Sequence, residues 1–411
     1  MLKVTDVIIV GGGASGIAAA IMIKEKSPHT SVTVFESNDR ILKKLLTTGN
    51  GRCNITNRSF DDTRYHGETP QLAADIISRF PPKMQADFFK KIGVPIVFEP
   101  DGKAYPMAYQ ASAVVDCLRF AAAEAGVLIK INACVTDVKR QSDGFQVTAD
   151  RQYSCRFLVI SAGGQAGGKL GGDGGYMLLK KLGHKINERR PSIVQVKTKG
   201  TLARSLKGIK INARVSVISG GNKTAADFGE VLFCDYGLSG PAVMQVSRAV
   251  SFDPTALISL DLFPEIETDK LAQIILDRTK RLSARPVSEL FTGIMNKRVW
   301  AAVLKTLKTE QNRASGALVK DEIKRIASAL KNFEFPCDGT LGFRDAQVTA
   351  GGASTAQFFE HSLMSKKAPG LYATGEVLDI DGDCGGFNLS WCWSSANAAA
   401  NDILAKQEPQ Q

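Results

Sequence analysis

The hydrophobic and polar positions of the first 40 residues follow the periods of a strand, a helix and a second strand. Asp6–Val10 is a short apolar run, Ala14–Lys26 is rich in alanine with apolar residues at helical spacing, and Ser31–Phe35 alternates. A strand, a helix and a strand in this order are typical of a βαβ unit in a parallel sheet. The pattern therefore predicts an α/β fold for the N-terminal part of the chain.

Segments of different character follow this unit up to about residue 161. Residues 40–57 are rich in Gly, Thr and Asn and have little periodicity, which is typical of a functional loop. The later periodic segments predict three helices and three strands. These are the helices Gln71–Arg79, Lys83–Ile92 and Ser112–Ala125 and the strands Leu128–Val138, Gly144–Ala149 and Phe157–Ser161.

The middle of the chain has two further patterns. Within residues 193–262 the apolar positions alternate, as in Ala213–Val217, and this indicates antiparallel β structure. Over residues 269–330 the period becomes helical, and after residue 336 short strands are predicted again at Ala346–Thr349 and Leu371–Thr374. The simplest division is one α/β domain interrupted by an inserted module of β structure and helices.

Three glycines mark the turn between the first strand and the first helix. Gly11, Gly13 and Gly16 form the pattern GxGxxG around Ala14 and Ser15. Gly11 permits a tight turn, Gly13 lets a pyrophosphate approach the backbone, and Gly16 lets the helix pack closely on the strand. The helix N-terminus adds unpaired N–H groups and partial positive charge. This turn therefore predicts a dinucleotide-binding site.

The type of dinucleotide follows from Glu36 and from the C-terminal segment. Glu36 ends the second strand, 20 residues after Gly16, where a carboxylate accepts hydrogen bonds from ribose hydroxyls and repels a 2′-phosphate. FAD or NAD is therefore predicted, and not NADP. The segments Gly370–Glu376 and Asp379–Leu389 precede an alanine-rich helix at Ser390–Leu404. A helix N-terminus there can stabilise the negative charge of a reduced flavin, which favours FAD.

Composition narrows the class of protein. The 411 residues are 44% hydrophobic and 23% charged, as in globular proteins, and no apolar run reaches the ~18 residues of a membrane span. The N-terminus has no basic region and no cleavage site, so it indicates a strand and not a secretion signal. Eight irregularly spaced cysteines and four histidines without paired spacing predict neither a disulfide framework nor a zinc site. We expect a cytoplasmic protein that binds no metal.

The charge is concentrated in the middle of the chain. The formal net charge is +11, and residues 193–337 hold 22 Lys and Arg against 14 Asp and Glu, an excess of eight positive charges. Many of them lie at helical spacing beside apolar residues, which indicates a solvated helix face; a nucleic-acid or anionic-substrate surface is the alternative. Between Lys270 and Lys331 the only aromatic residues are Phe291 and Trp300, whereas nucleic-acid grooves combine clustered charge with stacking aromatics. We predict a lid over a small molecule and only salt-labile RNA affinity.

Four motifs together resemble one family. Lys43–Asn57, with the sequence KKLLTTGNGRCNITN, matches its most distinctive motif, and Gly229–Phe233 with Gly237–Pro241 matches a second. Val348–Gly352 and Gly375–Leu389 match the third and fourth. The chain resembles, over nearly its whole length, the bacterial family of conserved hypothetical FAD flavoproteins. That family includes an aminoacetone oxidase and bile-acid-reductase-like NAD(P)/FAD-dependent oxidoreductases.

The resemblance implies a discontinuous Rossmann-like FAD-binding domain with an insert. The first part would be residues 1–192 and the second part residues 338–411. The insert, residues 193–337, would be a β-barrel over 193–264, a helical bundle over 265–330 and a return segment over 331–337. FAD would be held without a covalent bond.

The cofactor-binding residues that follow from the glycine turn and from the resemblance come from several segments. Val135 would meet the adenine through its backbone, and Thr48–Asn54 and Gly375–Leu389 would lie along the flavin. The full set is Gly11, Gly13, Ala14, Ser15, Gly16, Glu36, Ser37, Lys43, Lys44, Thr48, Gly49, Asn50, Gly51, Cys53, Asn54, Val135, Ala162, Gly163, Gly375, Glu376, Asp383, Gly386, Asn388 and Leu389.

Several residues have two interpretations. Cys53 has no partner cysteine in its motif, which favours packing over a redox role, and Arg52 would either clamp an anionic substrate or pair with a carboxylate. Packing or surface roles are favoured over general-base roles for the histidines and over a flavin wall for at least one tryptophan. These residues are His66, His184, His361, Trp391 and Trp393. The eight glycines of residues 163–175 are interpreted as a loop around the cofactor and not as a second nucleotide site.

These observations predict an FAD-dependent oxidoreductase that acts on a small organic substrate, with NAD(P)H as a transient electron donor. No second complete glycine fingerprint exists in the chain, so no dedicated nicotinamide domain is expected. The alternatives are an oxygen-using amine oxidase of the aminoacetone type, a flavoprotein that acts on tRNA, and a flavin-containing binding or sensor protein without turnover. The sequence assigns no catalytic residue.

Overall fold

The computed structural model describes residues 4–59 and 61–407. It forms two compact units. Unit 1 comprises Met1–Pro191 and Phe343–Gln411, and unit 2 comprises Ser192–Gly342. Unit 1 is thus built from both ends of the chain, and unit 2 is one continuous stretch.

Unit 1 is organised around a seven-stranded sheet. The order is β7-β2-β1-β10-β9-β8, and β19 pairs with β10. Four pairings are parallel, those of β1 with β2 and β10, of β2 with β7 and of β10 with β19. The strands are β1 (Val4–Val10), β2 (Val32–Phe35), β7 (Leu128–Lys130), β8 (Asp137–Gln141), β9 (Gly144–Thr148), β10 (Gln152–Ile160) and β19 (Leu371–Ala373).

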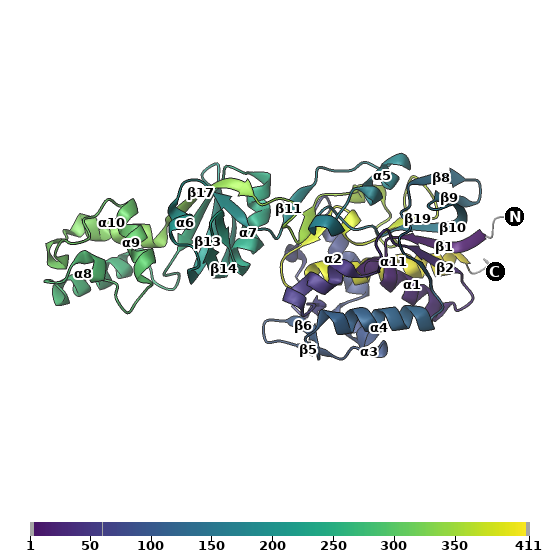
Figure 1. Cartoon of the computed structure of the whole chain (residues 1–411), viewed down its shortest axis with the longest axis horizontal. Coiled ribbons are helices and arrows are strands. Elements are labelled where there is room, and N and C mark those ends of the chain that lie inside the picture. The colour runs from purple at the N-terminus through teal and green to yellow at the C-terminus, as the bar shows by residue number, and fades with distance from the viewer. Residues whose placement is uncertain (1–3, 60, 408–411) are drawn as a thin grey trace. The chain divides into compact units, whose positions relative to one another are not determined.

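Both faces of this sheet are buried, which explains the continuous apolar run of β1. Val7 and Ile9 belong to a core cluster with the helices α1, α4 and α11, whereas Ile8 and Val10 belong to a second cluster with α2 and α5. α11 lies beside α1 (Figure 1), so the last helix of the chain packs on the first. The helices of unit 1 are α1 (Ala14–Lys26), α2 (Pro70–Arg79), α3 (Pro82–Lys91), α4 (Ala111–Glu124), α5 (Gly174–Lys181) and α11 (Phe387–Gln407).

Short pairings join distant parts of unit 1. β20 pairs antiparallel with β4, and β3 pairs with β6, which also pairs with β5. These strands are β3 (Thr56–Asn57), β4 (Tyr65–Gly67), β5 (Ile96–Phe98), β6 (Lys103–Pro106) and β20 (Ile380–Gly382), with β11 (Arg190–Ser192) and β18 (Val348–Ala350) as a further pair. The short 3₁₀ segments are η1 (Lys43–Gly51), η2 (Asp62–Arg64), η3 (Gly168–Leu170), η6 (Thr355–Gln357) and η7 (Gly375–Val377).

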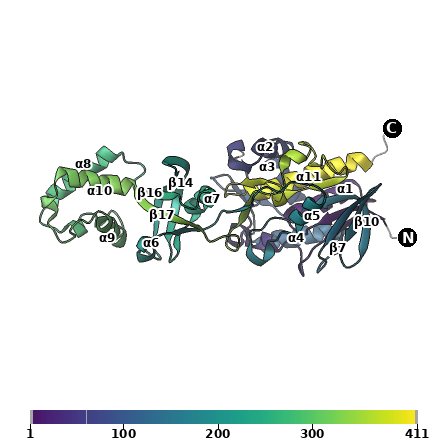
Figure 2. The ribbon, with the colours of Figure 1, turned by 90° about the horizontal axis from the view of Figure 1, so that it is seen from above.

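Unit 2 contains a closed six-stranded barrel and a helical part. The barrel order is β12-β15-β14-β13-β16-β17, and β12 closes it by pairing with β17. The helices α8, α9 and α10 lie together beyond the barrel (Figure 2) and share its apolar core, where Trp300 packs on Phe291. The elements are β12 (Val196–Thr198), α6 (Leu202–Ser205), β13 (Lys210–Ser219), β14 (Asn222–Phe233), β15 (Gly237–Ser239), α7 (Pro241–Phe252), β16 (Leu257–Asp261), α8 (Thr268–Arg281), η4 (Val287–Glu289), α9 (Lys297–Thr306), η5 (Ser315–Ala317), α10 (Lys320–Lys331) and β17 (Phe333–Thr340).

Most predicted elements exist in the structure, often with shifted ends, as where the strand predicted at Phe157–Ser161 is β10 (Gln152–Ile160). The helix predicted at Ala14–Lys26 has these bounds as α1. The single strand predicted at Leu128–Val138 is wrong, because Asn132 has a left-handed φ of 53° and the chain turns between β7 and β8. Residues 193–262 also contain the helix α7, residues 40–57 contain the helical turns of η1, and residues 331–337 enter the barrel strand β17.

Candidate functional site

The three glycines of the turn after β1 differ in their surroundings: Gly11 and Gly16 are tightly packed, whereas Gly13 borders open space. Gly11 has a φ of +108°, and a Cβ there would lie 2.3 Å from the carbonyl oxygen of Ser161. A Cβ on Gly16 would lie 2.1 Å from the carbonyl oxygen of Gly11. A Cβ on Gly13 would have no atom within 4 Å. Packing therefore requires glycine at positions 11 and 16, whereas position 13 borders open space.

This open space lies at an uncapped helix N-terminus. Gly13 is the N-cap of α1, no side chain caps the helix, and its first turn has no acidic residue. The first backbone N–H groups therefore remain available to an anion, and the helix dipole favours negative charge there. Ala14 and Ser15 begin the helix, and the Ser15 hydroxyl donates to the Thr374 carbonyl oxygen at 3.4 Å. The turn thus provides the cradle that a pyrophosphate needs.

Glu36 fixes the other side of this cradle. Its side chain is buried at the end of β2, and its Oε2 accepts a hydrogen bond from the Gly12 N–H at 2.9 Å. Its Oε1 accepts bonds from the Asn38 backbone and side chain, and more weakly from the Ser37 hydroxyl. The carboxylate therefore links the glycine turn to the end of the neighbouring strand. Its Oε2, which accepts only the Gly12 bond, retains capacity for a further donor such as a ribose hydroxyl.

The segment from Lys43 to Asn54 has an unusual backbone. Gly49, Asn50, Gly51 and Cys53 all have φ between 55° and 82°, in the left-handed region. Left-handed non-glycine residues cost free energy and cluster at functional sites, where the surrounding structure holds them. One contact that stabilises this backbone is the hydrogen bond from the Cys53 N–H to the Thr48 carbonyl oxygen, at 3.0 Å. A Cβ on Gly51 would meet open space, so this part of the segment also borders room for a ligand.

The side chains of this segment favour packing and polar anchoring. Cys53 is fully buried, and burial raises the pKa of its thiol to about 12, so a reactive thiolate is disfavoured. Asn54 is buried and accepts from the Ala104 N–H at 3.3 Å. The Arg52 guanidinium lies 4.8 Å from the ring centre of Tyr105, and its Nε donates to the Gly49 carbonyl oxygen. Arg52 therefore packs beside the segment.

Two C-terminal residues meet the N-terminal segments. A Cβ on Gly375 would lie 2.6 Å from the Ser15 hydroxyl oxygen, so the start of η7 and the start of α1 are in close contact. The Glu376 Oε2 pairs with the Lys44 ammonium at 2.7 Å, and its Oε1 accepts from the Thr349 N–H at 2.9 Å. The structure thus brings together three motifs that lie far apart in the sequence.

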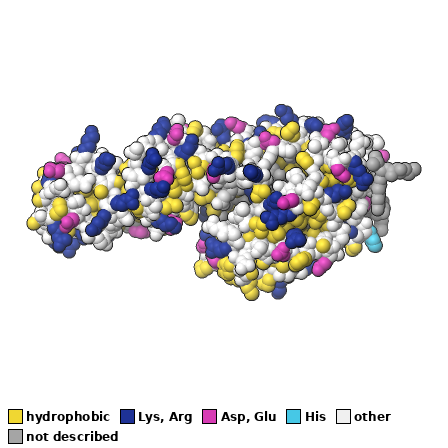
Figure 3. Space-filling model, viewed as in Figure 1, with side chains coloured by type: hydrophobic (Ala, Val, Ile, Leu, Met, Phe, Trp, Pro, Cys, Tyr) yellow, Lys and Arg dark blue, Asp and Glu magenta, His cyan; other side chains and the backbone are white. Residues whose placement is uncertain are grey.

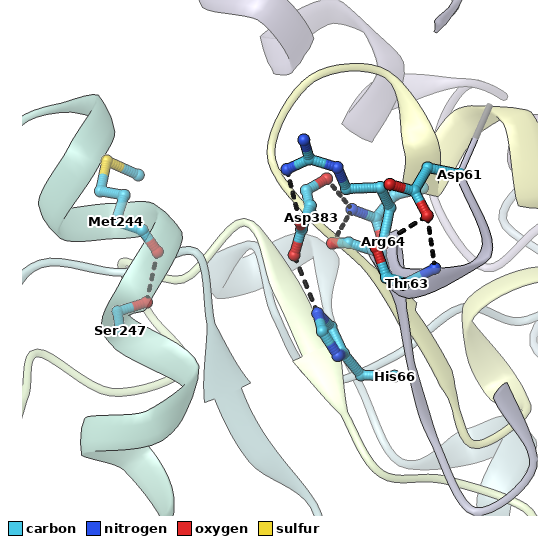
Figure 4. A network of polar contacts seen from close by, with 9 residues as sticks. Asp61, Thr63, Arg64, His66, Met244, Ser247 and Asp383 are labelled. Carbon is cyan, nitrogen blue, oxygen red and sulfur yellow. Dashed lines mark hydrogen bonds and ion pairs between the residues drawn. The ribbon is translucent and has the colours of Figure 1, made fainter. Parts of the chain in front are cut away.

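The predicted residues near the N-terminus of α11 form another contact region. The Asn388 side chain donates to the Gly382 carbonyl oxygen at 2.6 Å and accepts from its N–H at 2.8 Å. A Cβ on Gly386 would lie 2.5 Å from the carbonyl oxygen of Thr56, beside Asn54. Asp383 pairs with Arg64 and His66, which come from the segment around β4, as Figure 4 shows. The start of α11 therefore adjoins the segment of Asn54.

The remaining predicted residues are placed as follows. Lys43 pairs with Asp39, Val135 is buried between β7 and β8, and Leu389 packs on the core of the sheet. Ala162 and Gly163 follow β10, and a Cβ on Gly163 would meet open space. Trp391 and Trp393 are both buried, and their ring N–H groups donate to the carbonyl oxygens of Gly375 and Ile55. His184 is buried against Phe358, and His361 contacts Arg79.

Sequence reasoning missed the contacts that hold the predicted residues. Thr349 fixes Glu376, and the Ser161 hydroxyl bonds that of Thr374 at 2.7 Å across β10 and β19. His66 and Arg64 were not associated with Asp383. The one available signal was the alternation of Asp379, Asp381 and Asp383, because alternate residues of a strand lie on one face.

The excess basic residues of unit 2 are dispersed over its surface and do not form one cluster in the view of Figure 3. Basic side chains are spread over the face of unit 2 shown in Figure 3, with acidic side chains between them. Several are paired within the unit, such as Lys331 with Asp261 at 2.7 Å and Arg313 with Glu322 at 2.6 Å. These half-buried pairs neutralise basic charge locally, so fewer basic groups are left to form one positive surface.

The described residues contain neither a helix suited to spanning a membrane nor a cluster suited to binding a metal ion. Among residues 4–59 and 61–407, no helix has the length and apolar character that crossing a membrane requires. In the same part of the chain, no group of three or more His, Cys, Asp and Glu side chains is placed to hold a metal ion. All eight cysteines lie within the described residues, and no disulfide joins them there.

The family is decided by a match over almost the whole chain. The model described as the HI0933-like protein Rossmann domain matches residues 5–402. The chain belongs to this family. The resemblance seen in the sequence motifs is therefore confirmed, and so is the fold class, a Rossmann-type FAD-binding domain with a closed β-barrel. The open, uncapped turn at Gly13 fits the pyrophosphate of the FAD that this family binds.

Curated relatives of this HI0933-like protein cover nearly its whole length. The 3-dehydro-bile acid delta(4,6)-reductase of Clostridium scindens is 33% identical over 397 residues, 95% of this chain and 97% of the relative. The ribosomal RNA dihydrouridine synthases of Haemophilus influenzae and Escherichia coli are each 28% identical, over 98% and 97% of this chain and 99% and 98% of theirs. The protein is an FAD-dependent oxidoreductase by family.

Solved structures agree in fold. An E. coli quinol fumarate reductase chain has a TM-score of 0.50 and 14% sequence identity, and the alignment covers 99% of this chain and 71% of that one. At this identity the similarity concerns the fold alone.

Proposed function

We propose that this protein is an FAD-dependent reductase that adds hydrogen across a carbon–carbon double bond next to a carbonyl group in a small organic substrate. NAD(P)H would be the electron donor. The observation that carries the proposal is the convergence of the open turn at Gly13, the left-handed segment Gly49–Cys53 and the start of α11 in unit 1. The name of the bile-acid relative supports the reductase direction.

The residues that would hold FAD follow from this convergence. The N-terminus of α1 would bind the pyrophosphate, Glu36 would accept from the ribose, and Lys44 with Glu376 would lie along the ribityl chain. Thr48–Asn54 and Gly386–Leu389 would border the flavin ring. When bound, FAD supplies hydride chemistry, and the protein's part is to position it and to bias its charge.

Electron input and output distinguish this proposal from the alternatives. The chain has one GxGxxG fingerprint that opens a helix, so NAD(P)H would bind transiently without its own βαβ unit. An amine oxidase of the aminoacetone type would pass electrons to oxygen, whereas a reductase would pass them to an activated alkene. A binding or sensor protein would do neither.

Three measurements test the proposal. The purified protein should release FAD on denaturation, because FMN lacks the adenosine ribose that Glu36 would bind. Under anaerobic conditions NADH or NADPH should bleach the flavin absorbance, and 4-androstene-3,17-dione or 2-cyclohexenone should restore it. Recovery of FMN alone would contradict the cofactor assignment. Bleaching by aminoacetone with oxygen consumption, and no reoxidation by either enone, would favour the oxidase.

A second candidate is the same reduction on a base of RNA. The observation that favours it is the excess of eight positive charges in residues 193–337, together with the rRNA dihydrouridine synthase relatives. The spread of these charges and their local ion pairs favour the small molecule. Binding to tRNA and rRNA fragments should be measured at low and at near-physiological salt. Tight, sequence-selective binding at the higher salt would favour the RNA substrate.

A further inference from the structure

Asp383 is the centre of a compact polar cluster in unit 1. Its Oδ1 lies 2.8 Å from the Nε2 of His66, and its Oδ2 lies 3.2 Å from a terminal nitrogen of Arg64. The Asp383 N–H also donates to the Arg64 carbonyl oxygen at 2.9 Å. Figure 4 shows both side chains converging on the carboxylate. The pairing of β4 with β20, which places His66 opposite Asp381, builds this cluster into the fold.

The cluster lies directly before the helix that would face the flavin. Asp383 precedes α11 by four residues, and the Asn388 side chain, in the first turn, contacts the carbonyl oxygens of both Gly382 and Asp383. Asn57 from β3 donates to the Gly385 carbonyl oxygen at 2.9 Å. His66 is therefore tied, through Asp383, to the end of unit 1 where Asn54 and the start of α11 meet.

The other side chains near the start of α11 that could donate a proton are buried or already hydrogen-bonded. Burial raises the pKa of the Cys53 thiol to about 12. Burial also raises the pKa of Tyr65, whose hydroxyl donates to the Phe387 carbonyl oxygen at 3.0 Å. Glu376 is held by Lys44 and the Thr349 N–H. The His66 side chain is 34% exposed, so a substrate can reach its ring while Nε2 stays on Asp383.

From this arrangement we propose that His66 is the catalytic acid of the reduction and that Asp383 is its positioning residue; this rests on the proposed function. As the π bond of the alkene opens, the β-carbon gains a hydride with its electron pair, which the NAD(P)H-reduced cofactor supplies. The α-carbon gains the proton from Nδ1 of the His66 imidazolium. The neutral ring keeps its Nε2–H on Asp383 and regains a proton from water. Two C–H bonds form, one π bond breaks, and charge is balanced.

The charges around the ring are consistent with this role. Asp383 binds Nε2, Asp381 lies opposite His66 in the β4–β20 pair, and Arg64 shares the Asp383 carboxylate. Residues directly opposite in an antiparallel pair point to the same face. Two carboxylates and one guanidinium therefore surround the ring: Asp381 lies in β20, Asp383 directly follows β20, and Arg64 directly precedes β4.

The first test compares His66→Gln with His361→Gln. His361 is another partnered histidine, on Arg79 and outside the cluster, so it controls for loss of an imidazole. Reoxidation of the reduced protein by 2-cyclohexenone should slow at least ~100-fold in H66Q, while flavin reduction by NAD(P)H and FAD content stay unchanged. H361Q should match the native protein. Added imidazole should restore part of the rate in His66→Ala.

The second test does not require hydride transfer. The native protein with oxidised FAD should catalyse exchange of the α-hydrogens of cyclohexanone with D₂O, the reverse of the proposed proton transfer, and H66Q should lose this exchange. Exchange without enone reduction would contradict the proposed function and leave the role of His66 supported. Exchange that persists in H66Q, or absence of both reactions in the native protein, would overturn the inference.

A third measurement uses no catalysis. In protein with ¹⁵N-labelled histidine, the hydrogen-bonded Nε2–H of His66 should be visible, and its signal should disappear in H66Q and shift in Asp383→Asn. With only four histidines in the chain, the signals are readily assigned. An unchanged His66 signal in D383N would contradict the proposal that Asp383 positions the His66 ring. Circular dichroism of each variant establishes that the fold is intact.

Discussion

The same kind of substitution at two neighbouring glycines should give opposite defects. In Gly13→Val, the new side chain enters open space, because a Cβ at this position has no atom within 4 Å. The backbone of Gly13, with φ of −80° and ψ of −170°, is accessible to any residue. In Gly11→Ala, by contrast, φ is +108° and the new Cβ would lie 2.3 Å from the Ser161 carbonyl oxygen. We expect G13V to fold without FAD and G11A to be unstable.

The magnitudes follow from these two environments. G13V should change the free energy of unfolding of the apoprotein by less than ~1 kcal/mol, since it alters only an N-cap. It should cost FAD binding one charge-assisted hydrogen bond, ~1.5–3 kcal/mol, and part of the helix-dipole attraction, ~0.3–1 kcal/mol. The FAD dissociation constant should therefore rise roughly 20- to 700-fold. G11A should lose about 3 kcal/mol of stability through left-handed strain and overlap.

Two assays separate these effects. Urea unfolding of the apoproteins, followed by circular dichroism, gives the free energies of unfolding, and fluorescence titration with FAD gives the dissociation constants. Retention of native FAD affinity by G13V would refute the assignment of the open space to the pyrophosphate. Native stability of G11A would refute the argument from its backbone and from the contact with Ser161.

Three further predictions concern single contacts. Glu376→Ala should lower the free energy of unfolding by ~1–3 kcal/mol in urea, because it leaves the Thr349 N–H without its acceptor, whereas Glu376→Gln keeps that bond and should lose less than ~1 kcal/mol. Cys53 should resist iodoacetamide in the native protein while exposed Cys134 is alkylated, as mass spectrometry of the peptides would show, and Cys53→Ala should keep the flavin reduction rate within twofold. Burial, with Lys367 nearby, lowers the pKa of His184 to about 4. In the unfolded chain His184 is protonated below about pH 6.5, whereas in the folded protein it stays neutral down to about pH 4. The free energy of unfolding therefore falls by up to about 3 kcal/mol as the pH drops from about 6.5 to about 4. His184→Gln should flatten this part of the melting-temperature profile, and an unchanged profile would contradict the burial argument.

The sequence was informative where the signal is local. The strand, the glycine turn and α1 occupy fewer than 30 residues, and each follows from periodicity and from the backbone freedom of glycine. Glu36 was predictable from its spacing, and the structure adds that it holds the Gly12 N–H. The insert was recognisable because its apolar period changes, although the 12-residue helix α7 was not distinguished from the strands on either side.

Contacts between distant short segments were not predictable. β4 and β20 have three residues each, too few for any period, and Asp383 and His66 are 317 positions apart. The interruption after β7 depends on the left-handed backbone of Asn132, which one asparagine among β-favouring residues does not reveal. The positioning of Lys44 by Glu376 likewise depends on the docking of β19 beside β10. Tertiary packing decides these features.

The construction of unit 1 from both ends of the chain sets an order of events during synthesis. Ser192–Gly342 forms unit 2 from one continuous stretch, so all of its contacts can form while the rest of the chain is still on the ribosome. The central sheet must wait for β19 and for α11, which supplies the surface against α1. A nascent chain that already carries the whole glycine turn therefore cannot complete the central sheet or the packing of α1 until residues 371–407 have emerged. Folding of unit 1 is thus delayed until after the synthesis of unit 2, although unit 1 contains the first strand of the chain.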